Sequence, residues 1–72
     1  VSVSAEEARS ATVKYLESSI NADKSEVSSI ATRIYQSNIE ALEQSKYGKN
    51  INWNIVMALQ GEMGRISPEE FV

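Results

Sequence analysis

Cysteine and histidine are both absent from this chain of 72 residues. Without cysteine the fold cannot be held by disulfides, and without either residue the zinc sites built from cysteine and histidine are excluded. Histidine is also the most common general acid or base at neutral pH. Serine–lysine neighbours such as Ser45-Lys46 point in different directions on a helix and make a poor nucleophile–base pair. We therefore expect a protein that is not an enzyme, with no catalytic residue, no cofactor-binding residue and no metal ligand.

The chain also lacks a basic cluster and a long apolar run. Ten acidic and seven basic residues give a formal net charge of −3, and the basic residues are scattered. Nucleic acid is an unexpected partner, because contacts to phosphate normally require a basic surface. No apolar run approaches the roughly 20 residues of a membrane span, and no signal-peptide pattern is visible. The expectation is a cytoplasmic protein with no membrane partner, and no small-molecule substrate is inferred.

Signals for the start of a helix are frequent. Ser4 and Asp23 are each followed three residues later by glutamate, which is the capping-box pattern. Pro68 follows a serine and occupies the first helical position, where its missing N–H carries no penalty. The four candidate N-caps are Ser4, Asp23, Asn52 and Ser67.

The ends of the helices are indicated by glycine and by short connections. Gly48 and Gly64 each occupy a candidate C′ position after an apolar segment. The caps and stops together predict helices over about 5–20, 24–46 and 53–63, followed by a short turn over 68–72 in which Phe71 docks on the bundle. The short connection Asn21-Ala22 favours antiparallel packing of the first two helices. The predicted fold is all-α: a single domain over 1–72, built as a small three-helix bundle with a short C-terminal helical turn.

Apolar residues recur at helical spacing in all three segments. The predicted core faces are Ala5, Ala8, Thr12, Val13, Tyr15, Leu16 and Ile20 in the first helix, Val27, Ile30, Ala31, Ile34, Tyr35, Ala41 and Leu42 in the second, and Ile55, Val56, Leu59 and Met63 in the third. Asn38 falls in the middle of the second face. Two interpretations stay open for it. It is either a polar residue that specifies register or oligomeric state, or an ordinary Asn that bonds to a backbone carbonyl or a buried water or lies at the end of a narrowing apolar stripe.

Three large apolar residues lie off these faces. Trp53 and Met57 are i, i+4 neighbours in the third helix, and Ile39 lies off the face of the second. They are either covered by other helices or exposed as a contact surface. Trp is common among interface anchors, and a chain this small without disulfide or metal gains stability by association. We interpret Trp53, Met57 and Ile39 as partner-binding residues of a non-catalytic protein–protein interaction module, whose partner is another protein or further copies of the chain.

The first half of the chain supports an alternative. Val1-Ser2-Val3-Ser4 alternates like a short strand, and the second helix begins Lys24-Ser25-Glu26-Val27. This pattern resembles the ribbon-helix-helix repressors and antitoxins, whose second helix often begins with a basic-Ser-Glu-hydrophobic sequence. The resemblance implies a dimeric DNA-binding regulator that inserts a two-stranded ribbon into the major groove. This sequence departs from that pattern, because its ribbon segment has no basic residue and no glycine separates the two helices.

Overall fold

The computed structural model describes residues 3–71, and within that range it contains helices and no strand. The elements are α1 (Ala5–Ser19), α2 (Lys24–Tyr35), α3 (Ile39–Glu43), the 3-10 helix η1 (Gly48–Asn50), α4 (Trp53–Met63) and α5 (Pro68–Phe71). The predicted all-α small bundle is confirmed, since α1, α2 and α4 form its body. The predicted bounds of the first and third helices agree with α1 and α4, whereas Val72 of the predicted terminal turn lies outside the described residues.

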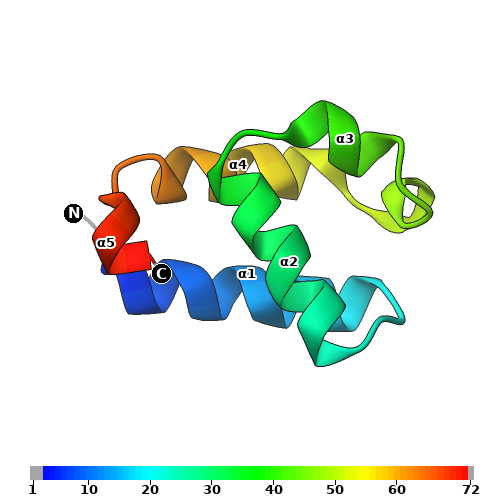
Figure 1. Ribbon diagram of the computed structural model, residues 1–72, viewed down its shortest axis with the longest axis horizontal. Helices are drawn as coiled ribbons and strands as arrows, with labels where there is room; N and C mark the ends of the chain where they lie inside the picture. The colour runs from blue at the N-terminus through cyan, green and yellow to red at the C-terminus, as the bar shows by residue number, and fades with distance from the viewer. Residues whose placement is uncertain (1–2, 72) are drawn as a thin grey trace.

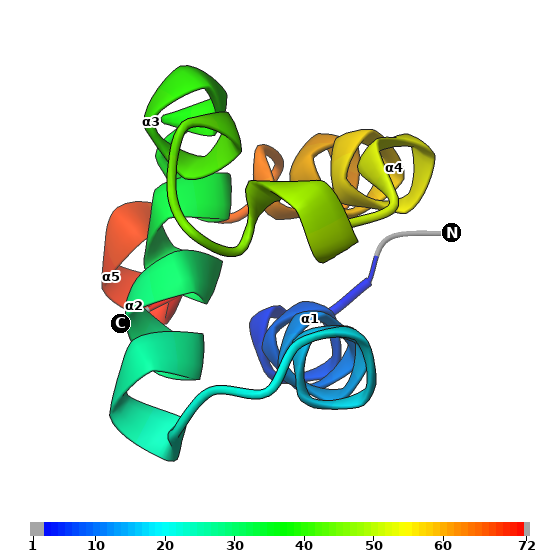
Figure 2. The ribbon, with the colours of Figure 1, turned by 90° about the vertical axis from the view of Figure 1, so that its right-hand side faces the viewer.

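Helices α1 and α4 lie side by side and run in opposite directions, and α2 crosses both of them (Figures 1 and 2). The first two helices are neighbours, as the short connection predicts, but they cross, so the expected antiparallel packing is wrong. Its physical reason lies in the connection, where Ile20 and Asp23 have extended backbone with ψ of 148° and 168°. This extended segment redirects the chain, so that the antiparallel neighbour of α1 is α4.

Three of the four predicted N-caps form in the expected way. The backbone N–H of Glu7 donates to Ser4 Oγ at 3.1 Å, and that of Glu26 donates to Asp23 Oδ1 at 2.9 Å. Asn52 caps α4 by accepting from the N–H of Asn54 at 3.1 Å. At the start of α5, the Ser67 hydroxyl donates to the Glu70 carboxylate at 3.1 Å. The three bonds made by Ser4, Asp23 and Asn52 satisfy backbone N–H groups that have no partner within the helix. They explain why these helix starts can be predicted from the sequence.

The predicted continuous helix over 24–46 is wrong, because α2 ends at Tyr35. The N–H of Asn38 donates to the Arg33 carbonyl at 2.9 Å, and the N–H of Ser37 donates to the Ile34 carbonyl at 3.1 Å. This pair of bonds is a Schellman motif, and its C′ residue, Ser37, has a φ of 64°. Glycine usually takes that left-handed position. A serine there hides the helix end from sequence reasoning.

The break between α2 and α3 also changes the interpretation of Asn38. Its side chain is exposed and precedes α3, so it does not lie in the core. The interpretations that place Asn38 in the core of a continuous helix are therefore wrong, and its position beyond the end of α2 is compatible with the remaining one, an Asn at the end of a narrowing stripe. The apolar face that Asn38 interrupts belongs to two separate helices.

Gly48 is required by close packing rather than by a left-handed backbone. It starts η1 without a positive φ. A Cβ at this position would overlap the carbonyl group of Glu43, because it would lie only 2.9 Å from the carbonyl carbon and closer still to the oxygen. Gly64 is the C-cap of α4 with a right-handed φ of −63°. Neither glycine is the left-handed C′ residue that its position in the sequence predicts.

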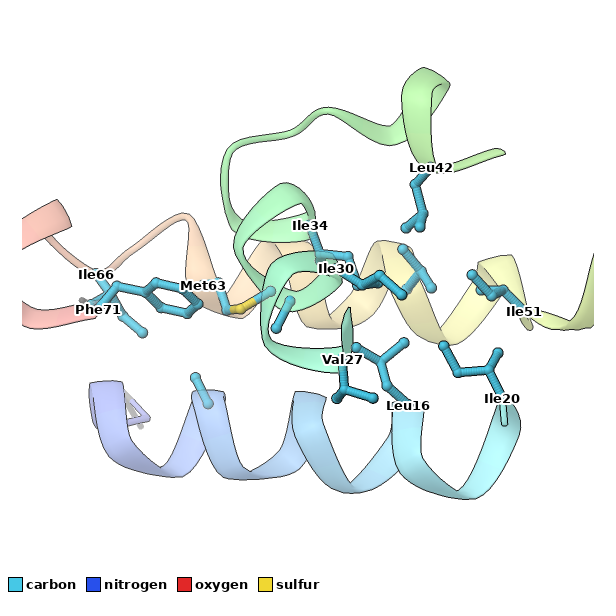
Figure 3. Packing of buried hydrophobic residues seen from close by; sticks show 13 residues of the cluster. Leu16, Ile20, Val27, Ile30, Ile34, Leu42, Ile51, Met63, Ile66 and Phe71 are labelled. Atoms are coloured by element: carbon cyan, nitrogen blue, oxygen red, sulfur yellow. The ribbon is translucent and has the colours of Figure 1, made fainter. Parts of the chain in front are cut away.

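The core is formed where α1, α2 and α4 meet (Figure 3). Helix α3 contributes Leu42 and α5 contributes Phe71. The predicted face of α2 is confirmed, and Leu42 joins the core from α3. Thr12 is buried among these residues and donates through Oγ1 to the Ala8 carbonyl at 2.8 Å. The buried hydrophobic residues are Ala8, Leu16, Ile20, Val27, Ile30, Ala31, Ile34, Leu42, Ile51, Val56, Met63, Ile66 and Phe71.

The short helix α5 docks through Phe71, as the sequence predicts. Its ring stacks on that of Tyr35 with centroids 4.3 Å apart, and the Arg9 guanidinium lies 5.2 Å from its centroid. The Tyr35 hydroxyl donates to the Ile66 carbonyl at 2.9 Å. A single helical turn is unstable alone, so these contacts hold the segment in place.

Candidate protein-contact surface

Helix α4 carries little charge although it lies at the surface of a charged protein. No charged residue lies between Lys49 and Glu62, although a quarter of the whole chain (24%) is charged. Val56 and Met63, seven residues apart, are fully buried and fix which side of the helix faces the core. The opposite side faces outward and is uncharged up to Gly61; Glu62, in the last turn, forms an ion pair with Arg65 at 3.6 Å.

We call the outward side of this helix the α4 face. It consists of five exposed residues: Asn54, Ile55, Met57, Ala58 and Gly61. With about 100° between successive residues, Asn54, Ala58 and Gly61 lie opposite the buried side, and Ile55 and Met57 lie on either side of them. Ile55 is 40% exposed and Met57 is 56% exposed; within residues 3–71 they are the exposed large hydrophobic residues. The α4 face is therefore a low centre of small side chains between two larger apolar ones.

Gly61 has no side chain, so the α4 face is most recessed at this residue. Among residues 3–71, a Cβ at Gly61 would meet no atom within 4 Å beyond its chain neighbours and its own helix backbone. Its φ is not positive. The fold of a single chain therefore gives no steric reason for glycine at this position.

Helix α4 is held at both ends. The Tyr15 hydroxyl of α1 accepts from the N–H of Asn52 at 2.5 Å and donates to the carbonyl of the same residue at 3.3 Å. Near the other end, Gln60 Nε2 donates to Ser37 Oγ at 2.6 Å. These bonds join the helix to α1 and to the turn after α2, so the α4 face is presented on a fixed element.

The structure separates the three predicted partner-binding residues. Met57 is on the α4 face, and Trp53 lies one turn before it on the same helix but is half-buried against the core. Ile39 is at the start of α3, where it is also half-buried against the core. Trp53 can thus contribute only an edge to the α4 face, and Ile39 belongs to a different helix.

Sequence reasoning missed four residues of this surface: Asn54, Ile55, Ala58 and Gly61. Ile55 is predicted as core, and its exposure shows that this prediction is wrong. The reason is geometric, because Ile55 and Val56 are adjacent and point about 100° apart, so that only one of them can face the core. The uncharged run between Lys49 and Glu62 was the signal that could have revealed the surface.

A second polar cluster joins the segment after α3 to the first turn of α2. The Tyr47 hydroxyl donates to the Glu26 carboxylate, and Lys46 Nζ lies 3.7 Å from the same carboxylate. The pKa of Lys46 is raised by its interactions with Tyr47 and Glu26, and the pKa of Tyr47 is raised by its hydrogen bond to Glu26 and by burial. A lysine base needs a lowered pKa. The cluster joins the segment after α3 to the first turn of α2, and the raised pKa favours the ammonium form of Lys46.

The recesses of the surface are small or shallow. The most enclosed one has a volume of about 150 Å³ and lies between α1, α2 and Phe71, with Arg9 and Thr32 among its polar residues. Sites for small molecules usually measure roughly 300–1,000 Å³. The recesses that reach this size, such as one of about 610 Å³ beside Asn21 and Lys46, are wide open to solvent. Within residues 3–71, no group of three acidic residues is placed to hold a metal ion. The helices of that range are also too short or too polar to cross a bilayer.

The ribbon-helix-helix alternative gains no support from the described residues. The resemblance implies a strand over Val1–Ser4, but Val1 and Ser2 lie outside the described residues, and Val3 packs against the core. Three further helices, α3, α4 and α5, follow the two that the resemblance covers. The DNA-binding alternative stays a prediction.

No protein-family model matches the chain, and no curated protein or solved structure is significantly similar to it. The functional argument therefore depends on the geometry of the α4 face.

Proposed function

We propose that this chain is a non-catalytic protein–protein interaction module and that the α4 face is its contact surface. The observation that carries the proposal is the exposure of Ile55 and Met57 on either side of a helix that has no charged residue from Trp53 to Gly61. Exposed apolar residues are common singly, but a contiguous uncharged surface with two large apolar side chains is characteristic of contact sites. Met suits such a surface because its flexible thioether adapts to different neighbours.

Energetics support the same proposal. Covering the exposed parts of Ile55 and Met57 would contribute about 1 kcal/mol each, since full burial of such side chains is worth about 1.5–3 kcal/mol. Gly61 costs the isolated chain about 0.5–1 kcal/mol of helix stability relative to alanine. A partner that approaches the helix backbone closely gives a reason for glycine here, whereas the contacts within the chain give none.

Site-specific photo-crosslinking tests the proposal. A photoreactive amino acid replaces Ala58 on the α4 face in cells that make the protein naturally, and the matched control replaces Ala11, an exposed alanine of α1. We expect a discrete adduct of defined mass from position 58 and none from position 11. Adducts of equal yield from both positions, or none from position 58, would contradict the proposal.

A further inference from the structure

We infer that the turn between α2 and α3 is a hinge, at which two copies of this chain exchange their C-terminal halves to form a domain-swapped dimer. In that dimer, α2 and α3 join into one continuous helix over residues 24–43. Helices α4 and α5 of each copy then pack on α1 and α2 of the other. The exchange does not involve the α4 face, and it goes beyond the proposed function.

The turn holds its backbone in a strained conformation. Ser37 has a φ of 64°, in the left-handed region where a Cβ crowds the backbone. Glycine adopts this conformation without strain, but the turn consists of Gln36, Ser37 and Asn38. Short connections under strain favour domain swapping, because a straightened connection in the dimer releases the strain.

The sequence across the turn suits a continuous helix. From Lys24 to Glu43 it contains neither glycine nor proline, the two residues that most disfavour a helix interior. Ala31 and Leu42 are eleven residues apart, which is about three helical turns, so a straight helix would place both on one side. The same sequence is therefore compatible with a broken helix and with a straight one.

Straightening preserves the backbone hydrogen bonds of the turn. In the broken form, the N–H of Ser37 donates to the Ile34 carbonyl at 3.1 Å, and that of Asn38 donates to the Arg33 carbonyl at 2.9 Å. In a continuous helix the two donors exchange acceptors, because each N–H bonds to the carbonyl four residues before it. Within residues 3–71, Asn38 makes no side-chain cap bond at the start of α3. The first N–H groups of α3 would therefore gain partners from the end of α2.

The contacts that hold the fold together join its first half to its second. Helix α1 has α4 as its antiparallel neighbour (Figures 1 and 2). Hydrogen bonds link the Tyr15 hydroxyl to Asn52, and the ring of Tyr35 stacks on that of Phe71. Each of these contacts joins a residue before Ser37 to a residue after it. A swapped dimer therefore forms the same contacts between the two chains and buries the same core in each lobe.

The monomer and the swapped dimer thus differ at the hinge. The dimer gives up the hydrogen bond from Gln60 Nε2 to Ser37 Oγ, which lies at the surface. Joining two chains also costs translational and rotational freedom. We therefore expect the monomer at low concentration and the swapped dimer after folding at high concentration, where two chains meet before each closes on itself.

Refolding at two concentrations tests the inference. The full chain is unfolded in urea, refolded at micromolar or millimolar concentration, diluted to the same final concentration and analysed by sedimentation velocity. We expect monomer from the dilute sample and a dimer fraction from the concentrated one. The dimer should persist after dilution, because its return to monomer requires the exchanged halves to separate. A dimer held by surface contact alone would dissociate on dilution.

Variants at the hinge give the expected changes a direction. Ser37→Gly relieves the strain of the turn and weakens the continuous helix, so the ratio of dimer to monomer after millimolar refolding should fall roughly tenfold or more. Ser37→Ala should raise this ratio about fivefold, because alanine favours the helix. Ser29→Gly and Ser29→Ala are the matched controls, since Ser29 is an exposed residue inside α2 in both forms. They should leave the ratio unchanged.

The exchange itself is measured from the contact between the rings of Tyr35 and Phe71. In a dimer refolded from a mixture of ¹³C-labelled and unlabelled chains, isotope-filtered NMR should detect this contact between the chains. A wild-type chain that stays monomeric after millimolar refolding would overturn the inference. A dimer that Ser37→Gly forms as readily as wild type, or one whose Tyr35–Phe71 contact stays within a chain, would overturn it as well.

Discussion

Replacing Gly61 with alanine tests whether this position faces outward from the fold. The added methyl group enters open space, since an added Cβ there meets no atom within 4 Å outside its own helix. Alanine in a helix is more stable than glycine by about 0.5–1 kcal/mol. In a domain of this size, that gain raises the melting temperature by about 2–8 °C.

The assay is urea unfolding of wild type and Gly61→Ala at 10 μM, followed by circular dichroism. Gly48→Ala is the control, because the same methyl group there overlaps the Glu43 carbonyl and should destabilise the fold. We expect opposite signs for the two glycines. A Gly61→Ala variant that is less stable than wild type would refute the open, outward position of Gly61 and with it the geometry of the α4 face.

Three further outcomes are expected. Ser37→Gly should raise the free energy of unfolding by up to about 1 kcal/mol in denaturant titration, because Ser37 has a φ of 64°, where a Cβ is strained; Ser29→Gly, inside α2, should lower it, and the same sign for both would contradict the Schellman end. Asp23→Ala should cost about 0.5–2 kcal/mol through loss of the cap to the Glu26 N–H, with Ser29→Ala nearly neutral; equal losses would mean that the cap is not formed. In a mobility-shift assay, the chain should leave duplex DNA unshifted at low salt, whereas a salt-sensitive shift would favour the ribbon-helix-helix alternative.

The helix starts could be predicted from sequence because caps are local. Ser4, Asp23 and Asn52 each bond to an N–H two or three residues away, so the pattern and the contact lie in the same short segment. The end of α2 could not be predicted in this way. Its Schellman motif requires a left-handed residue, and Ser37 lacks the glycine signature. The core packing of Ile34 and Leu42 around the break selects this conformation against the preference of serine.

The orientation of the helices and the exact surface also depend on long-range contacts. The crossing of α2 over α1 and α4 comes from extended backbone between Ile20 and Asp23, whose length alone favours an antiparallel pair. The outward position of Met57 was predicted from its distance from the core stripe. The exposure of Ile55 could not be predicted. Whether Ile55 or its neighbour Val56 faces the core depends on where α1 and α2 pack against α4.

Chemical-shift mapping by NMR tests the central claim most directly. Spectra of the ¹⁵N-labelled chain in buffer and in a lysate of the cells that make the protein naturally report which backbone amides change environment on binding. Our account predicts changes that concentrate on the α4 face, at Asn54, Ile55, Met57, Ala58 and Gly61, and that vanish in Ala58→Glu. Spectra that are identical in both conditions, or changes that concentrate on α1 or α5, would contradict it.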